Sequence, residues 1–307
     1  MRIIYQSEKD TFPPCVATVG FFDGLHVGHR FLIEELKAIA TSQNKKSVVV
    51  TFSTHPRKVL HSDFQPQLIT TLSEKLVQLE STGIDACIIL DFTIEMAKLS
   101  AYEFLKTILF EQFNVQTLLV GHDHRFGHNR TDGINEYQQY GNQLGLEVIE
   151  AKYYSTETDH HISSSTIRSA LKNGNIELAN RLLTYEYSFM GKVVDGFKVG
   201  HKIGFPTANI EPEDTEKLIP AIGVYAVRVR WNSQYYKGMM NIGNRPTMDN
   251  GENISIEVHI IDFDTNIYNE TVEIDFIRKI RDEKKFNSVE ELVEQLHKDK
   301  QSVLDLD

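Results

Sequence analysis

The sequence predicts an α/β domain followed by an all-β domain that ends in a helix. From residue 16 to about 151, short apolar runs alternate with patterns of helical spacing, which is typical of a doubly wound parallel sheet. After about residue 186 the apolar period changes to two, which is typical of an antiparallel sheet or barrel. We therefore expect two domains, 1–185 and 186–307.

Five apolar runs and the helical patterns between them define the first domain. Ser100 and Glu103 have the spacing of a capping box, so we expect a helix to begin there. Two short helices, at about 166–173 and 176–183, are expected to end the domain. Leucines at 72, 76 and 79 indicate another helix. The strands are expected at 16–19, 48–52, 87–92, 118–121 and 147–151.

Alternating runs define the second domain. Asn232 and Ser233 are expected to form a hairpin turn between the first two strands. A second capping-box spacing, from Ser288 to Glu291, predicts a helix at the C-terminus. The strands are expected at 224–231, 235–241, 254–260 and 272–276.

Composition and charge limit the classes of function. The 307 residues are 41% hydrophobic and 24% charged, as in ordinary globular proteins. A net charge of −11 argues against a general nucleic-acid binder, and the sequence has neither a long apolar run nor a signal-peptide core. We expect a cytoplasmic monomer or weak homo-oligomer, without nucleic-acid or membrane partners. Cys15 and Cys87 are expected to be buried thiols.

The most informative motif, Gly-Phe-Phe-Asp-Gly-Leu-His-Val-Gly-His at 20–29, joins the first strand to a helix. Glycines let a polyphosphate approach the main chain, and a helix N-terminus offers unpaired N–H groups. His26 and His29 are three residues apart, so both imidazoles can point at one phosphate. A chance glycine-rich turn is the alternative. The candidate nucleotide-binding residues are Gly20, Phe22, Asp23, Gly24 and Gly28.

A second segment of the first domain also suits phosphate. Ser164, Ser165 and Thr166 form a hydroxyl-rich helix start, although such residues are also ordinary helix caps. Arg168 follows, and its guanidinium matches phosphate oxygens and can stabilise a leaving pyrophosphate.

The His-x-Gly-His spacing resembles the signature of adenylyl- and cytidylyltransferases. The first domain as a whole resembles the FMN adenylyltransferase module of bacterial bifunctional flavin synthases. This resemblance implies a Rossmann-like domain that transfers adenylyl from ATP to FMN, giving FAD and pyrophosphate with Mg²⁺. It places His26, His29 and Arg168 on the phosphates of ATP.

The segment 121–127 is similar to a flavin-side loop of the same family, which implies that Asp123, Arg125 and Phe126 bind the flavin. A transition-metal site is a competing interpretation, because His122, Asp123, His124 and His128 lie close together in the sequence. The sequence departs from the family's usual pattern at Phe21, Ser53, Thr54, His124 and His201.

In the second domain, glycines shape the chain before Thr207 and Asn209. A turn between strands would explain the glycines alone. On an extended segment Thr207 and Asn209 project to one side, where their oxygens can hold Mg²⁺ with phosphate. The segment Gly-Phe-Pro-Thr-Ala-Asn at 204–209 closely resembles the riboflavin kinase signature. By that resemblance the nucleotide-binding residues are Gly196, Lys202, Gly204 and Pro206.

Glu257 lies on the strand face opposite Ile256 and Val258, where a solvated carboxylate is the ordinary interpretation. The resemblance to riboflavin kinases implies an antiparallel barrel in which Glu257 is the general base, while Arg281 and Glu283 belong to a flap beside the flavin. The whole chain is therefore expected to phosphorylate riboflavin and then adenylylate FMN. A transferase for another phosphate substrate and a non-catalytic flavin-binding protein are the alternatives.

Overall fold

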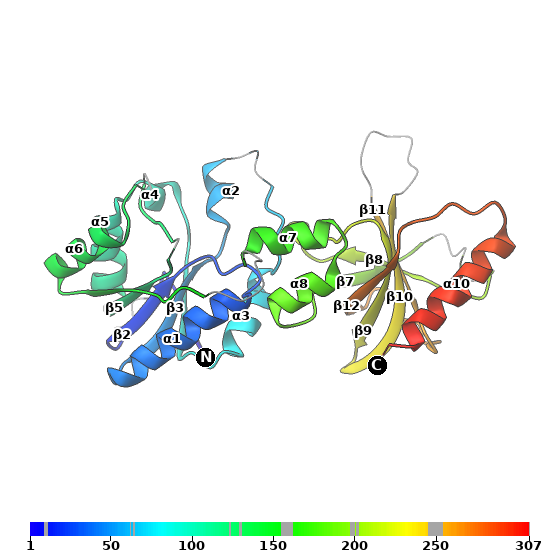
Figure 1. The fold of residues 1–307 in the computed structure, drawn as a ribbon, viewed down its shortest axis with the longest axis horizontal. Helices are drawn as coiled ribbons and strands as arrows, with labels where there is room; N and C mark the ends of the chain where they lie inside the picture. Colours follow the sequence, from blue (N-terminus) through cyan, green and yellow to red (C-terminus); the bar gives the residue numbers. More distant parts are fainter. Residues whose placement is uncertain are drawn as a thin grey trace. The chain divides into compact units, whose positions relative to one another are not determined.

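The computed structural model divides the chain into two compact units, Met1–Ser163 and Ser164–Asp307 (Figure 1). The predicted domain boundary, 185/186, lies further along the chain than this division. Asn180 in the second unit donates to the main-chain oxygen of Phe276 (2.8 Å) and accepts from the N–H of Tyr187 (2.8 Å). The domain boundary at 185/186 stays a prediction. The structure describes residues 1–8, 12–61, 63, 65–122, 124–128, 131–154, 162–196, 200, 203–244 and 254–306.

The first unit contains a six-stranded parallel sheet with the order β1-β4-β3-β2-β5-β6. The predicted doubly wound sheet is confirmed, and the direction of strand progression reverses between β2 and β5. The sequence pattern missed β1, an edge strand in which only Ile4 is buried. The strands are β1 (Arg2–Tyr5), β2 (Cys15–Val19), β3 (Lys46–Phe52), β4 (Ala86–Leu90), β5 (Val115–Val120) and β6 (Glu147–Glu150).

Helices cover both faces of this sheet. Val49 of β3 packs in one apolar cluster with Ile33 and Leu79, whereas Val50 packs in the other with Phe104 and Tyr137. The predicted capping box at Ser100 and Glu103 is confirmed, and the helix continues as a π-helix. The elements are α1 (Val27–Ser42), α2 (Pro56–Leu60), α3 (Leu72–Glu80), α4 (Ile94–Ala97), α5 (Ala101–Glu103), η1 (Phe104–Gln112) and α6 (Ile134–Leu144).

The second unit begins with two helices, α7 (Ser164–Lys172) and α8 (Ile176–Leu183), and then forms a closed antiparallel barrel with the strand order β10-β11-β8-β7-β12-β9. The predicted hairpin turn is confirmed: Asn232 and Ser233 have φ values of 48° and 63°, as a tight two-residue turn requires. The strands are β7 (Ser188–Val194), β8 (Ala208–Pro212), β9 (Gly223–Trp231), β10 (Gln234–Asn244), β11 (Ile254–Ile260) and β12 (Thr271–Arg281).

The sequence pattern missed β7 and β8, because glycine and polar residues interrupt their alternation. Gly191 in β7 is required by packing, since a side chain there would collide with Ile210 of β8. Inside the barrel, Val227, Val229 and Val258 converge on Gly238, where a Cβ would lie 3.1–3.2 Å from each of them.

The C-terminal helix α10 (Val289–Leu304) packs on the outer face of the barrel beside β10 (Figure 1). Val303 joins Met239 and Ala226 in an apolar cluster on that face. Ser288 caps the helix by accepting the N–H of Glu291, as predicted. The Glu291 carboxylate accepts the N–H of Asn287 (3.1 Å). In the predicted capping box it would accept the N–H of Ser288, so the observed contact is one residue earlier in the chain.

Two further expectations concern the whole chain. Cys15 and Cys87 are buried free thiols, as predicted, and burial raises the pKa of each to about 12. Among the described residues, no helix combines the length and the apolar character needed to cross a membrane.

Two candidate active sites

The loop between β2 and α1 lies at the carboxyl end of β2, where the strand order reverses and open α/β sheets bind ligands. His26 is the N-cap of α1, and its Nδ1 accepts the main-chain N–H of His29 at 3.3 Å. The two imidazole rings stack, with centroids 3.7 Å apart and an interplanar angle of 16°. The structure therefore brings both predicted histidines together at the start of the helix.

Both imidazoles are neutral near pH 7 in the free protein. Burial lowers the pKa of His26 to about 4, although Asp23 partly offsets this effect. Burial, followed by the neighbouring His26, His124 and Lys75, lowers the pKa of His29 well below its usual value. Since Nδ1 of His26 accepts a hydrogen bond, its Nε2 carries the proton and can donate to a ligand.

The glycines of this loop make room for the loop's own side chains, which the sequence did not reveal. A Cβ on Gly20 would lie 2.9 Å from the ring of Phe22, and one on Gly28 would lie 3.3 Å from the ring of His26. Gly24 adopts a left-handed φ of 79°, which favours glycine. A side chain at Gly20 would therefore press on the ring of Phe22, and one at Gly28 on the ring of His26.

Asp23 anchors the loop to the segment that precedes α3. Its carboxylate is 3% exposed and accepts the N–H groups of Ile69 (3.0 Å) and Thr70 (2.9 Å) and the Thr70 hydroxyl (3.2 Å). The N–H of Gly24 donates to the same hydroxyl at 3.0 Å. The hydrogen bonds of Asp23 thus hold the loop in its conformation. The contact of Asp23 with nucleotide stays a prediction.

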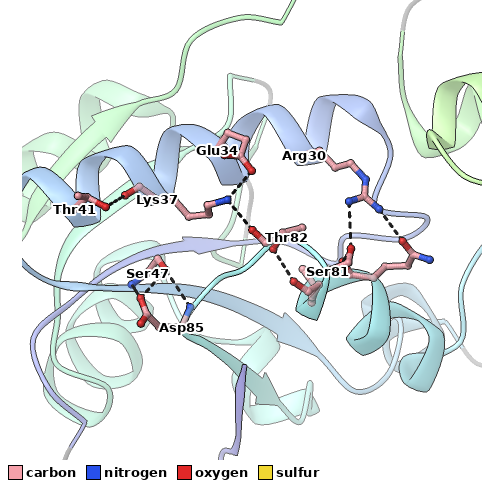
Figure 2. Close-up of polar contacts among 10 residues, drawn as sticks. Arg30, Glu34, Lys37, Thr41, Ser47, Ser81, Thr82 and Asp85 are labelled. Atoms are coloured by element: carbon pink, nitrogen blue, oxygen red, sulfur yellow. Dashed lines mark hydrogen bonds and ion pairs between the residues drawn. The ribbon is translucent and has the colours of Figure 1, made fainter.

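The end of α3 fixes α1 just beyond the two histidines. Arg30 donates to Gln78 (2.7 Å) and to Ser81 (3.4 Å), as Figure 2 shows for Ser81. Further along α1, Lys37 donates to the main-chain oxygen of Thr82 at 2.6 Å (Figure 2). The helix start that carries the imidazoles is therefore held in place by α3.

Described residues of the predicted flavin-side loop, 121–127, contact the segment and the helix α6 that follow it. Phe126 stacks on Tyr137, with centroids 4.1 Å apart, and its N–H donates to the Tyr137 hydroxyl at 3.0 Å. Arg125 donates to the main-chain oxygens of Thr131 (3.2 Å) and Asp132 (3.3 Å). Tyr137 was missed by sequence reasoning, since its part in shaping the loop depends on tertiary contact. The flavin contacts of Arg125 and Phe126 stay predictions, and Asp123 lies outside the described residues.

Two of the residues of the competing metal interpretation, His122 and His128, have polar contacts of their own. Nδ1 of His122 lies 3.0 Å from Glu150, and Nδ1 of His128 lies 3.1 Å from the main-chain oxygen of Ala97. Within the described ranges, His, Cys, Asp and Glu form no group of three or more that could hold a metal ion. Asp123, another residue of this interpretation, lies outside the described residues, so the metal site stays an untested alternative.

Three positions that depart from the family's pattern, Phe21, Ser53 and His124, have partners in the first unit; the ring of Phe21 lies 4.7 Å from that of His55. The Ser53 hydroxyl donates to Asp91 at 2.8 Å, and the ring of His124 lies 5.9 Å from that of Phe126. His201 lies outside the described residues.

The second predicted phosphate segment lies on α7. Ser164, Ser165, Thr166 and Arg168 occupy the first half of this helix, in the second compact unit, and Ile167 between them is fully buried. The contacts of these residues with nucleotide stay predictions.

In the barrel, three polar residues lie in register on adjacent strands. Asn209 of β8 pairs with Glu257 of β11, and Glu257 pairs with Asn241 of β10. Directly paired residues share a face, and Met239 places this face on the outside, beside α10. The Thr207 hydroxyl donates to Glu257 at 3.1 Å. The structure therefore brings together Thr207, Asn209 and Glu257, and adds Asn241, which sequence reasoning missed because it depends on strand register.

The segment before Thr207 is held closely against its surroundings. Gly196 lies against the carboxamide of Asn209, which leaves no room for a side chain, and Gly204 has a left-handed φ of 82°. The main-chain oxygen of Pro206 lies 2.8 Å from Nδ1 of His259. The predicted nucleotide contact Lys202 lies outside the described residues.

The predicted flap residues also have structural partners. Arg281 donates from Nε and a terminal nitrogen to Asp299 of α10 (3.1 and 2.8 Å), whose side chain is 1% exposed. Glu283 lies over Gly243, where a Cβ would be 2.6 Å from its carboxylate. Arg281 thus joins β12 to α10, and the flavin contacts of Arg281 and Glu283 stay predictions.

The first unit has a glycine-rich loop at the point where the strand order of its parallel sheet reverses. The second unit has Thr207, Asn209 and Glu257 close together on its barrel. These two sites define a two-domain transferase that uses nucleotides. The family model for FAD synthetase matches residues 8–166, and the model for riboflavin kinase matches residues 183–306. The chain belongs to the family of bifunctional riboflavin kinases/FMN adenylyltransferases. This finding confirms the predicted family and enzyme class.

Relatives match over nearly the whole chain. A "Bifunctional riboflavin kinase/FMN adenylyltransferase" of Bacillus subtilis is 38% identical, over 96% of this chain and 93% of its own. One from Listeria monocytogenes is 37% identical, over 93% and 90%. A crystal structure from Streptococcus pneumoniae, described as a macrolide-efflux protein, superposes with a TM-score of 0.91 at 33% identity and covers both chains fully.

Proposed function

We propose that the two sites divide flavin cofactor synthesis between them: the barrel phosphorylates riboflavin to FMN, and the β2–α1 loop site adenylylates FMN to FAD. The observation that supports this division is the difference between the surroundings of two carboxylates, those of Glu257 and Asp23. Glu257 meets one hydroxyl on the outer face of the barrel, whereas Asp23 is buried and satisfied by main-chain N–H groups. A carboxylate that can accept a proton is thus a feature of the barrel site.

Adenylyl transfer suits the loop site, because the attacking oxygen belongs to a phosphate that is already anionic near pH 7. FMN attacks the α-phosphorus of ATP, and pyrophosphate leaves. Such a step requires alignment and charge stabilisation rather than a base. His26 offers its Nε2–H, and the helix N-terminus offers its partial positive charge. We also propose that His29 binds phosphate in this loop site, and that Ser164, Ser165, Thr166 and Arg168 of α7 bind phosphates of ATP.

Polyphosphate binding would also change the charge of the imidazoles. A nearby anion favours the protonated form of histidine and thus raises its pKa. Two rings that are neutral in the free protein can therefore acquire positive charge as ATP binds, which strengthens their hydrogen bonds to phosphate.

Phosphorylation of riboflavin suits the barrel site, because the ribityl hydroxyl is neutral and must lose its proton as it attacks. Glu257 is proposed as the base, with Thr207 orienting its carboxylate. The Thr207 hydroxyl and the Asn209 carboxamide are hard oxygen donors on one side of the segment, and they fit Mg²⁺. Bound Mg²⁺ would neutralise charge on the phosphates.

The remaining proposals concern the nucleotide pocket of the barrel, and the location and partners of the protein. Gly196, Gly204 and Pro206 would shape the nucleotide pocket of the barrel, with Lys202 beside it. We propose a cytoplasmic enzyme, monomeric or weakly associated, that uses ATP, riboflavin and FMN without a nucleic-acid partner. The net charge of −11 supports the last point.

The test is chromatography of the purified protein incubated with riboflavin, ATP and Mg²⁺. FMN should appear first and FAD second, and supplied FMN should be converted to FAD without riboflavin. The absence of any flavin product would contradict the proposal, whereas FAD from supplied FMN alone would restrict it to the first unit.

A further inference from the structure

Lys75 of α3 is a buried lysine for which the proposed mechanism gives no role. Its side chain is 2% exposed, and its ammonium donates to three oxygens: Phe21 O (3.0 Å), Thr51 Oγ1 (3.1 Å) and Phe52 O (3.2 Å). An ammonium has three N–H donors, so these contacts satisfy it completely.

The three acceptors belong to two neighbouring strand ends. Thr51 and Phe52 end β3, and Phe21 follows β2 by two residues, at the entry to the histidine loop. The Thr51 hydroxyl also donates to Phe21 O at 3.1 Å. Lys75 therefore ties the first turn of the loop to the adjacent strand.

The side chain of Phe21 is held by the same lysine. The ammonium lies 4.1 Å from the centroid of the Phe21 ring, which is within the range of a cation–π contact. The ring of His55 meets Phe21 edge-on from another element, with centroids 4.7 Å apart. Phe21, which stands where the family often has Asn, is thus fixed through both its ring and its carbonyl.

The charge of Lys75 also affects the histidine pair. Burial lowers the pKa of Lys75 to about 8, so the ammonium remains mainly charged near pH 7. Its positive charge is one of the causes that lower the pKa of His29. A buried cation close to the imidazoles adds to the positive end of α1, and the interior weakens its field less than water would.

We propose that Lys75 is a positioning residue for adenylyl transfer: it fixes the entry of the 20–29 loop through Phe21 and supplies fixed positive charge behind the site of the ATP phosphates. This inference rests on the proposed function of the first unit. It extends that function to a residue that would not itself touch substrate.

The test compares Lys75→Met, Lys75→Arg and Lys46→Met in one assay of FAD formation from supplied FMN. Lys46 is the matched control, since it lies at the opposite end of β3 and forms an exposed ion pair with Asp85 (2.8 Å). Lys75→Met should lower kcat/KM for ATP by about 100-fold, the loss expected when a reacting group is misplaced by about 1 Å.

Three further readouts separate positioning from a general structural role. The KM for FMN should change by less than about 2-fold, because the loss concerns the phosphates of ATP. Riboflavin phosphorylation by the same variant should be unchanged, since it depends on the barrel. Lys75→Arg should recover at least about 10-fold of the lost kcat/KM, because it restores the charge. Lys46→Met should match the wild type.

A folded Lys75→Met protein with unchanged FAD formation would overturn the inference, and so would equal loss of both activities. If this variant fails to fold, Thr51→Val provides the test, since it removes one acceptor of the ammonium and one donor to Phe21 O while the lysine remains. We expect a loss of about 5-fold, equivalent to a single hydrogen bond; an unchanged rate would overturn the inference. A wild-type protein that makes no FAD would contradict the proposed function instead.

Discussion

The two sites hold their polar side chains in different ways. The loop site is built on a helix start, where stacked neutral imidazoles lie beside a carboxylate that main-chain N–H groups satisfy. The barrel site is built on strand register, which pairs Glu257 with Asn209 and Asn241, and the Glu257 carboxylate accepts a hydrogen bond from the Thr207 hydroxyl. Under the proposed function, the attacking oxygen of FMN is already anionic and that of riboflavin is a neutral hydroxyl, so only the barrel site needs a base.

The largest effect is expected from Glu257→Gln, which removes the base but keeps an acceptor for Thr207. Riboflavin phosphorylation should fall by about 1,000-fold, within the usual contribution of a general base. Adenylylation of supplied FMN should remain within about 2-fold. Separate initial rates for the two reactions provide the measurement, and an equal loss of both rates would refute the division of labour.

The converse effect is expected from His29→Ala and from Arg168→Ala. Each should reduce FAD formation by about 100- to 1,000-fold, the usual loss when a charge-stabilising donor is removed. FMN should accumulate from riboflavin at the normal rate. Unchanged FAD formation in either variant would remove that residue from the proposed site.

Acid should destabilise the first unit through its two buried histidines, His26 and His29. His26 has a pKa of about 4 when folded and about 6.5 when unfolded, so between these pH values the unfolded state binds more protons. His26 should therefore contribute a fall of roughly 3 kcal/mol in the free energy of unfolding as the pH is lowered from about 7 to 4, and His29 should act in the same direction. The contribution of His26 to stability is complete at pH values above the pKa that it has in the unfolded state. It is lost as the pH falls to the pKa that it has in the folded state.

Hydrogen exchange of the α1 amides measures this effect in the first unit. The single tryptophan, Trp231, lies in β9 and reports on the barrel by fluorescence. His26→Gln should flatten the pH dependence of exchange in α1, and an unaltered slope would show that another group is responsible.

The smallest effect is expected at His259, which lies two residues beyond Glu257 on the same strand face. Its Nδ1 lies 2.8 Å from Pro206 O, and its ring contacts Phe205 with centroids 5.2 Å apart. His259→Ala should lower riboflavin phosphorylation by about 10-fold, the loss of roughly one hydrogen bond, and His259→Asn should recover part of it by restoring a donor. Equal rates in both variants would contradict this role.

The architecture was largely predictable from the sequence, because apolar periodicity reports which face of an element is buried. The strands at 48–52 and 254–260 were found in this way. Edge strand β1 and the glycine-interrupted β7 were missed, since little of the first is buried and packing against Ile210 determines the second.

The sites were predictable where a motif fixes neighbouring residues, as for His26 and His29. They were not predictable where tertiary contact decides the role, as for Asp23 and Asn241. The burial of Lys75 could have been predicted from helical spacing. Lys75 lies three residues after Leu72 and four before Leu79, so it falls on the predicted apolar face of this helix.

The most direct test of the division of labour is to mix Glu257→Gln and Arg168→Ala proteins with riboflavin, ATP and Mg²⁺, and to measure FAD. Each variant alone should form almost no FAD from riboflavin. The mixture should form it readily, because FMN released by the Arg168→Ala protein supplies the intact loop site of the other. A mixture that accumulates FMN without forming FAD, or a single variant that forms FAD at the wild-type rate, would contradict the account.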